Sequence, residues 1–163
     1  FYPSFPRVYK NFHFLLSTIS QFKLLEYDFF FTINGTENKY SKYLISNYKH
    51  LKNVNYIGQV TLDQCYNIYR NIDILVFPSK LETWGLPLSE AQFFNKKIVA
   101  PDLEYVRENC YEYPNLYTYK NDDCKSFLKA LDNAKNSDIL KKNNSKSKLE
   151  VNNWNIILNE MLK

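Results

Sequence analysis

The feature that most constrains the fold of this chain is the repeated alternation of short apolar runs with helical patterns. The clearest run is 72–77, Ile-Asp-Ile-Leu-Val-Phe, which Pro78 and Ser79 stop. A nearly continuous apolar run of this length is typical of a strand buried on both faces of a parallel sheet. Similar runs stand at 27–33, 54–57, 97–100 and 116–119, and we interpret 1–3 as the end of a further strand.

The stretches between these runs carry the i, i+3, i+4 spacing of amphipathic helices. On the first such stretch, one face is formed by Phe12, Leu15, Leu16, Ile19 and Phe22. We expect helices at about 12–24, 40–52, 62–69 and 87–94, and a helical pattern from 122 to the end of the chain. That last region has one apolar stripe of Phe127, Leu128 and Leu131 and another of Trp154, Ile157, Leu158 and Met161, separated by a polar segment, 141–148.

Five or six alternations of strand and helix predict the α/β class. We expect a Rossmann-like parallel sheet with helices on both faces. The 163 residues suffice for one domain, and the net charge of +4 is too mild to single out a polyanionic partner. Cys65, Cys110 and Cys124 lack metal-ligand spacing, and His13 and His50 complete no cluster, so we expect no metal and three reduced thiols.

Ligands of such sheets bind beyond the carboxyl ends of the strands, so segment 78–91 is informative. Glu82 is predicted in a loop and Glu90 in the first turns of the next helix, where carboxylates suit sugar or ribose hydroxyls. Gly85 permits close approach of the backbone. Unpaired N–H groups near 86–88, at a helix N-terminus, suit a diphosphate. Taken singly, each carboxylate has an alternative explanation: Glu82 could be a solvated loop residue, and Glu90 could simply favour the start of a helix.

Segment 78–91 resembles the E-x7-E motif of retaining GT-B glycosyltransferases, especially family 4, the group 1 glycosyl transferases. The matching residues are Pro-Ser at 78–79, Glu-Thr-Trp-Gly-Leu-Pro at 82–87 and Glu-Ala at 90–91, after an apolar strand. The resemblance extends from about Tyr2 to the pattern around Trp154. It implies that 1–163 is a single donor-binding domain, one half of a GT-B fold, and a fragment of a longer enzyme whose amino-terminal acceptor domain is absent.

The resemblance also implies roles for individual residues. Glu82 would bind donor-sugar hydroxyls near the reacting carbon, and Glu90 would hold the ribose hydroxyls. The segment formed by Thr83, Trp84, Gly85 and Leu86 would approach the sugar and the distal phosphate. The loop with Gly58 and Gln59 would approach the base.

Two cations follow the first predicted strand, Arg7 and Lys10, and both suit the charge of a diphosphate leaving group. Members of the family usually space this Arg and Lys five or six positions apart, whereas here the spacing is three. We therefore regard Lys10 as the stronger candidate. Segment 35–38 is interpreted as an ordinary loop, and Glu104, Arg107 and Glu108 as structural residues at the start of a helix.

From the resemblance we expect transfer of a sugar, of hexosyltransferase type, from a nucleotide diphosphate sugar to a hydroxyl of a saccharide or lipid-linked acceptor. Retention of configuration is implied, with Lys10, Arg7 and the helix N-terminus in place of a metal. The isolated fragment is expected to be inactive. No Asp-x-Asp motif is present, and no cofactor or nucleic-acid partner is expected.

Two alternatives stay open at this point. One is a GT-B-like sugar-nucleotide epimerase, and the other is a non-catalytic nucleotide-binding or interaction domain. We further expect a role in bacterial polysaccharide biosynthesis, a cytoplasmic location, and an inner-membrane-associated parent protein without a transmembrane segment. The residues do not specify the base, the sugar, the acceptor or the linkage.

Overall fold

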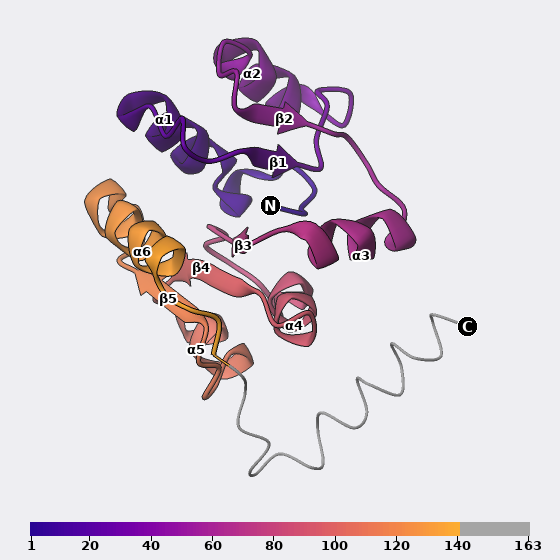
Figure 1. The fold of residues 1–163 in the computed structure, drawn as a ribbon. Coiled ribbons are helices and arrows are strands. Elements are labelled where there is room, and N and C mark those ends of the chain that lie inside the picture. The colour runs from indigo at the N-terminus through magenta and orange to yellow at the C-terminus, as the bar shows by residue number, and fades with distance from the viewer. Residues whose placement is uncertain (141–163) are drawn as a thin grey trace.

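The computed structural model describes residues 1–140 (Figure 1). The apolar stripe at 154–161 and the polar segment at 141–148 lie outside the described residues. The described residues form five strands: β1 (Phe29–Phe31), β2 (Val54–Tyr56), β3 (Ile74–Val76), β4 (Lys97–Pro101) and β5 (Leu116–Tyr119). Every pairing between them is parallel.

The first two residues of the chain join the two halves of the sheet. Tyr2 forms a parallel bridge with Phe31, and its N–H donates to the Phe30 carbonyl at 2.9 Å. On the other side, the Val76 N–H donates to the Phe1 carbonyl at 3.0 Å. The resulting order is β2, β1, residues 1–2, β3, β4, β5, which is the order of a Rossmann sheet. The chain therefore reverses its direction of winding between residues 1–2 and β3.

Helices cover both faces of this sheet (Figure 1). The described helices are η1 (Val8–Lys10), α1 (Phe12–Phe22), α2 (Lys39–Tyr48), α3 (Leu62–Asn71), α4 (Leu86–Phe93), α5 (Glu104–Asn109) and α6 (Cys124–Asn136). On one face α1 meets α6, where the Phe14 and Phe127 rings lie 5.8 Å apart. On the other, Tyr69 of α3 stacks on Phe94 beside α4 at 5.6 Å. The predicted α/β, Rossmann-like class is confirmed.

Aromatic side chains fill the centre of the core, beneath the carboxyl ends of the strands. Tyr2 contacts Phe12 at 4.6 Å, Phe77 at 5.7 Å and Phe31 at 6.4 Å between ring centroids, and all four are buried. Buried aromatic rings contribute large apolar areas and prefer tilted or edge-to-face contacts. The core therefore supports the loops that follow residues 1–2 and β3.

Several predicted boundaries are wrong by a few residues. Phe22 was predicted on the buried face of the first helix, yet it is 38% exposed. The reason is that α1 ends at Phe22, where Lys23 adopts left-handed backbone (φ 48°), so the last turn reaches beyond the sheet. Helix α2 likewise ends at Tyr48, not near 52.

Two other predictions, for Pro87 and for the cysteines, are confirmed. Pro87 lies in the first turn of α4, where a missing N–H costs nothing. The three cysteines, all within residues 1–140, form no disulfide. Among the described helices, none combines the length and the apolar character that crossing a bilayer requires.

Candidate functional site

The candidate site lies at the carboxyl edge of the sheet, where the loops after residues 1–2 and after β3 are neighbours. Their backbones are joined by a hydrogen bond from the Lys80 N–H to the Tyr9 carbonyl, at 2.8 Å. Beside it, Lys10 Nζ and Glu82 Oε1 form an ion pair at 2.5 Å. Their side chains are only 17% and 12% exposed. The structure thus brings two of the predicted site residues into direct contact.

Lys10 is held by the short helix η1 and by aromatic rings. Its N–H donates to the Arg7 carbonyl at 3.0 Å, and its carbonyl accepts from the Tyr2 hydroxyl at 2.6 Å. The ammonium group lies 5.6 Å from the Tyr9 ring centroid and 5.9 Å from that of Phe77. Such contacts attract the ammonium group to the negative face of each ring. Lys10 is therefore held in place at the edge of the core.

Glu82 is positioned by the turn that follows β3. Ser79 is fully buried, and its hydroxyl donates to the Leu81 carbonyl at 3.1 Å. The Tyr105 hydroxyl, from α5, donates to the Ser79 carbonyl at 2.7 Å. Burial and then the nearby Glu82 charge raise the pKa of Tyr105, so its hydroxyl keeps its proton as a donor. Helix α5 thereby supports the loop that carries Glu82.

A second ion pair lies beside the first and was not predicted. Asp122, in the β5–α6 loop, accepts from Lys80 Nζ at 2.6 Å and from Asn11 Nδ2 at 3.0 Å. Burial alone would raise the pKa of Asp122, but these hydrogen bonds and the Lys80 charge outweigh it and lower the pKa. The sequence offered one signal: an acidic residue, like Glu82, follows a predicted strand on the ligand side. The partners, however, are distant in the chain.

The N-terminus of α4 faces the same edge. Gly85 has left-handed backbone (φ 78°), and an added Cβ would lie 3.2 Å from Leu88 Cδ1. The expectation of free N–H groups through residue 88 is wrong at Leu88, because its N–H donates to the Gly85 carbonyl at 2.8 Å within the first turn. Within residues 1–140, the N–H groups of Trp84, Gly85 and Leu86 have no acceptor. These three donors are available to an anion.

Segment 83–86 is anchored from one side only. The Trp84 carbonyl accepts from Asn109 Nδ2 at 3.0 Å, and the indole N–H donates to Ser89 Oγ at 3.2 Å. Gln92 donates to the Asn109 side chain at 2.9 Å, which orients the amide. Trp84 is nevertheless 49% exposed, while Thr83 and Leu86 are also exposed. The backbone is thus held while the side chains stay open to solvent.

Glu90 takes no part in the Lys10–Glu82 pair. It lies partly buried on α4 against α3, where burial raises its pKa and the nearby Tyr69 hydroxyl, which donates to the Pro87 carbonyl at 3.3 Å, partly offsets the effect. Burial, followed by the Glu90 charge, raises the pKa of Cys65 on α3 to about 12. A carboxylate desolvated in this way gains from any hydroxyl or cation that reaches it.

The structure places the other predicted residues in loops along the same edge. Arg7 is exposed, with its guanidinium 5.4 Å from the Phe5 ring centroid, and it forms no ion pair with residues 1–140. Gly58 has φ 71°, and an added Cβ would lie 2.9 Å from Asn34 Nδ2, so the turn requires glycine. Gln59 is exposed next to it.

The loop at 34–38 is closed by hydrogen bonds between its own residues. Glu37 accepts from the Asn34 and Gly35 N–H groups at 2.7 and 2.9 Å. Burial acts to raise the pKa of Glu37, but the backbone hydrogen bonds prevail and lower it. Asn38 caps α2 and donates to the Pro6 carbonyl at 2.7 Å, which fixes the start of the Arg7 loop.

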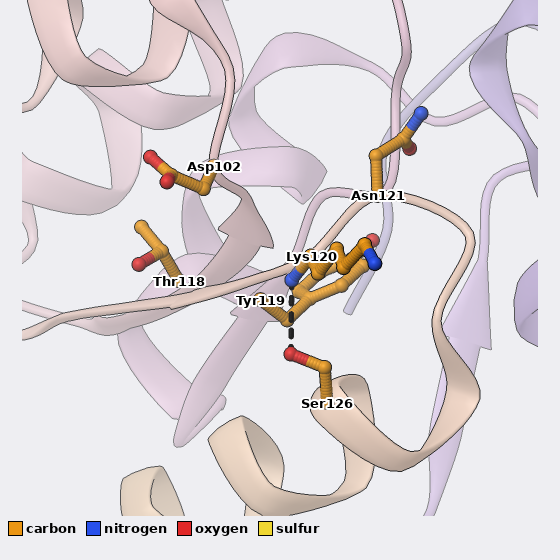
Figure 2. A pocket seen from close by; sticks show the side chains of 6 residues that line it. All are labelled: Asp102, Thr118, Tyr119, Lys120, Asn121 and Ser126. Atoms are coloured by element: carbon orange, nitrogen blue, oxygen red, sulfur yellow. Dashed lines mark hydrogen bonds between the residues drawn. The ribbon is translucent and has the colours of Figure 1, made fainter.

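A shallow polar hollow of about 450 Å³ lies farther along the edge, at the ends of β4 and β5 and the start of α6 (Figure 2). Its lining residues are Asp102, Thr118, Tyr119, Lys120, Asn121 and Ser126. The Lys120 N–H donates to Ser126 Oγ at 2.9 Å, so part of this polarity is already satisfied. Residues 1–140 hold no group of three or more His, Cys, Asp or Glu side chains arranged to bind a metal ion.

Solved structures share this architecture. A glycosyltransferase from Rickettsia africae superposes with a TM-score of 0.73 at 19% identity, over 99% of this chain and 47% of its own. UDP-GlcNAc 2-epimerase from Methanocaldococcus jannaschii, in complex with UDP-GlcNAc and UDP, superposes with a TM-score of 0.69 at 16% identity. The match covers 98% of this chain and 44% of the epimerase. The catalytic domain of starch synthase IV from Arabidopsis thaliana, bound to ADP and acarbose, superposes with a TM-score of 0.64 at 16% identity, over 82% of this chain and 29% of its own. Identities this low establish the fold alone.

The chain spans less than half the length of each of these three structures. Among curated proteins, none matches it. The family model described as "Glycosyl transferases group 1", however, matches residues 2–150, which include both loops of the Lys10–Glu82 pair. The chain belongs to the family of group 1 glycosyl transferases.

Proposed function

We propose that this chain binds the nucleotide diphosphate sugar of a retaining glycosyltransferase. The observation that carries the proposal is the Lys10–Glu82 ion pair at the switch point of the sheet, beside three unpaired N–H groups at the start of α4. A site that binds a diphosphate joined to a sugar needs three kinds of group: a cation, amide donors and a carboxylate. The first two suit phosphate oxygens, and the third suits sugar hydroxyls.

Charge explains why Lys10 and Glu82 lie together. A free carboxylate beside a diphosphate would repel it, whereas a carboxylate paired with Lys10 presents a neutral unit. When the sugar–phosphate bond breaks, negative charge grows on the leaving diphosphate. Lys10 and the N-terminus of α4 can stabilise that charge without a metal ion. Glu82 would meanwhile orient the sugar at the reacting carbon.

The remaining site residues extend along the same edge. Thr83, Trp84, Gly85 and Leu86 would approach the sugar and the distal phosphate, while Glu90 would hold the ribose hydroxyls. Gly58 and Gln59 would border the base, and Arg7, exposed and unpaired within residues 1–140, would add charge near the phosphates. Partly buried Glu90 suits a ribose diol because hydroxyl donors would compensate the desolvation that raises its pKa.

The acceptor site, by this proposal, lies on a second, amino-terminal domain. The isolated chain would therefore bind donor but transfer little, since transfer requires both substrates to be held in one geometry. We further propose that the parent enzyme acts in bacterial polysaccharide synthesis, in the cytoplasm, on a saccharide or lipid-linked acceptor at the inner face of the membrane.

The proposal is tested by titrating the chain with UDP, GDP, ADP, dTDP and CDP while backbone amide shifts are followed by NMR. We expect one diphosphate to bind selectively and to shift Lys10, Gly58, Glu82 and Glu90. Lys10→Met should weaken binding about tenfold or more, because a cation at the phosphates is lost. The matched control is Lys129→Met, an exposed lysine on α6, which should change nothing. Absence of binding at millimolar diphosphate would contradict the proposal for the isolated chain.

The likeness to UDP-GlcNAc 2-epimerase supports a second candidate. Such an enzyme would share a nucleotide site but would interconvert free nucleotide sugars. The family match favours the transferase. Incubating the full-length protein with UDP-GlcNAc and an acceptor separates the two: an epimerised nucleotide sugar without glycosylated product would establish the epimerase.

A further inference from the structure

Asp122 connects the two loops that carry Lys10 and Glu82, although it belongs to neither. It lies after β5 in left-handed backbone (φ 58°), a conformation that aspartate tolerates better than most residues. One carboxylate oxygen accepts from Lys80 Nζ at 2.6 Å, and the other accepts from Asn11 Nδ2 at 3.0 Å. A single side chain thus engages both loops at once.

The two partners adjoin the candidate site residues. Asn11 directly follows Lys10, is 7% exposed and has φ 58°, and its side chain caps no helix, so the amide is directed to Asp122. Lys80 lies two residues before Glu82, and its backbone N–H donates a hydrogen bond to the Tyr9 carbonyl. Any movement of Asp122 would therefore be transmitted to both members of the ion pair.

Stability alone is a weak reason for this arrangement. The Lys80 and Asp122 side chains are 40% and 48% exposed, and pairs that are so exposed contribute little to folding. By contrast, the Lys10–Glu82 pair is largely buried, and displacements of about 1 Å at such a site change reactivity strongly. The contact between Asp122 and its partners has more influence on geometry than on the folding equilibrium.

We propose that Asp122 is a positioning residue that sets the Lys10–Glu82 contact through Lys80 and Asn11. The proposal rests on the donor-binding function argued above, in which Lys10 contacts the diphosphate. Asp122 itself touches no substrate. Its effect would be to keep the cation and the carboxylate at the distance that the diphosphate and the sugar require.

The test compares four single variants of the chain and one double variant, which combines Asp122→Asn with Lys80→Met. Asp122→Asn keeps the shape and the tolerance for left-handed backbone but removes the charge, and Lys80→Met removes the same bond from the other side. Lys80→Arg keeps a cation and should restore the contact. The matched control is Glu26→Ala, which breaks a similarly exposed ion pair with Lys135 at the opposite edge of the sheet. In that pair, Lys135 Nζ lies 3.5 Å from Glu26 Oε2.

Two readouts are used. The first needs no ligand: the Lys10 ammonium protons are followed by 1H–15N NMR, because they exchange slowly with water only while they donate to Glu82. We expect their signal to broaden in Asp122→Asn and Lys80→Met and to persist in Lys80→Arg and Glu26→Ala. The second is affinity for the diphosphate that the wild-type chain binds best among UDP, GDP, ADP, dTDP and CDP. We expect about a tenfold loss in the first two variants, and no further loss in the double variant.

The outcomes separate the two proposals. An unchanged Lys10 signal and unchanged affinity in Asp122→Asn and Lys80→Met would overturn the positioning role. Equal losses in Glu26→Ala would also overturn it, because they would show a general effect of stability. If the Lys10 signal responds as expected while the wild-type chain binds none of the diphosphates, the positioning role stands and the donor-binding function fails. Urea unfolding of each variant identifies any that fails to fold.

Discussion

The loops at the carboxyl edge of the sheet are of two kinds, which differ in where their polar side chains find partners. In the outer loops, 34–38 and 57–61, most partners are local: Glu37 accepts from Asn34 and Gly35, and Thr61 and Gln64 cap α3 reciprocally, although Asn38 also donates to the Pro6 carbonyl. In the central loops, 3–11 and 77–85, the charged side chain of one reaches the other. The Lys10–Glu82 pair spans 72 positions of sequence.

This difference shows how position in the sheet determines the use of a loop. Outer loops lie beyond neighbouring strands that wind in one direction, so each can close on itself. The central loops follow residues 1–2 and β3, between which the winding reverses. The charges that meet between these loops, Lys10 and Glu82, are held by contacts between residues distant in the sequence. Substitutions in both kinds of loop test this difference.

The largest effect is expected at Glu82, in a central loop, and it is compared with the same substitution at Glu37, in an outer loop. In the full-length protein, Glu82→Gln should lower the transfer rate about a hundredfold or more, because a neutral amide neither balances Lys10 nor accepts two hydroxyls. Glu37→Gln, in an outer loop, should leave transfer within about threefold of wild type. Rates are measured with saturating donor and acceptor. Full transfer by Glu82→Gln would remove this residue from the essential set.

Replacing a glycine by alanine should lower the free energy of unfolding by different amounts in the two kinds of loop, because different atoms surround Gly58 and Gly85. Gly58→Ala should lower the free energy of unfolding by about 2 kcal/mol, since it adds backbone strain and a Cβ that lies 2.9 Å from Asn34 Nδ2. Gly85→Ala should cost about 1 kcal/mol, because the nearest atom, Leu88 Cδ1 at 3.2 Å, belongs to a flexible side chain. Urea unfolding measures both. An equal loss at the two sites would contradict the steric argument.

The contribution of Glu37 to stability should depend on pH. Its pKa is lowered in the folded state, so its stabilising effect is present above the unfolded pKa and is lost as pH falls through the folded pKa. Glu37→Gln should therefore destabilise the chain by about 0.5–1 kcal/mol at pH 7, and by progressively less as the pH is lowered towards 3. Unfolding is followed by circular dichroism across this range. A difference that did not shrink in acid would point to lost packing.

The smallest effect, of opposite sign, is expected at Glu90. Burial raises its pKa, so its contribution is present below the unfolded pKa and is lost as pH rises through the folded pKa. Glu90→Gln should thus stabilise the chain by about 0.5 kcal/mol at pH 7 while weakening diphosphate binding. Thermal unfolding and titration of the same samples check both. Destabilisation at pH 7 would indicate that the carboxylate is already satisfied.

Much of this arrangement could be predicted from local patterns. The apolar runs and the helical spacing predicted the class of fold, and the position of Glu82 in the loop after β3 and of Glu90 on the following helix was predicted correctly. Pro87 correctly indicated the start of α4. These signals are local, because burial, helix period and turn chemistry act over a few residues.

The contacts that organise the site could not be predicted in the same way. Asp122 meets Asn11 across 111 positions and Lys80 across 42, and no spacing rule relates such residues. The use of the Leu88 N–H within the first turn depends on the left-handed backbone of Gly85, which only the folded loop reveals. Phe22 fitted the helical period but lies where the helix ends.

Trp84 gives the molecule a built-in optical probe. It is the one tryptophan within residues 1–140, it is 49% exposed, and its backbone supplies one of the three N–H groups that have no acceptor in that part of the chain. An indole held by a single hydrogen bond to Ser89 emits at a wavelength that reports its contact with water. After a Trp154→Phe replacement, the tryptophan fluorescence of the chain would come from this one side chain. Any ligand that changes the contact of this indole with water could then be followed on the millisecond scale, without labelling the protein or the ligand.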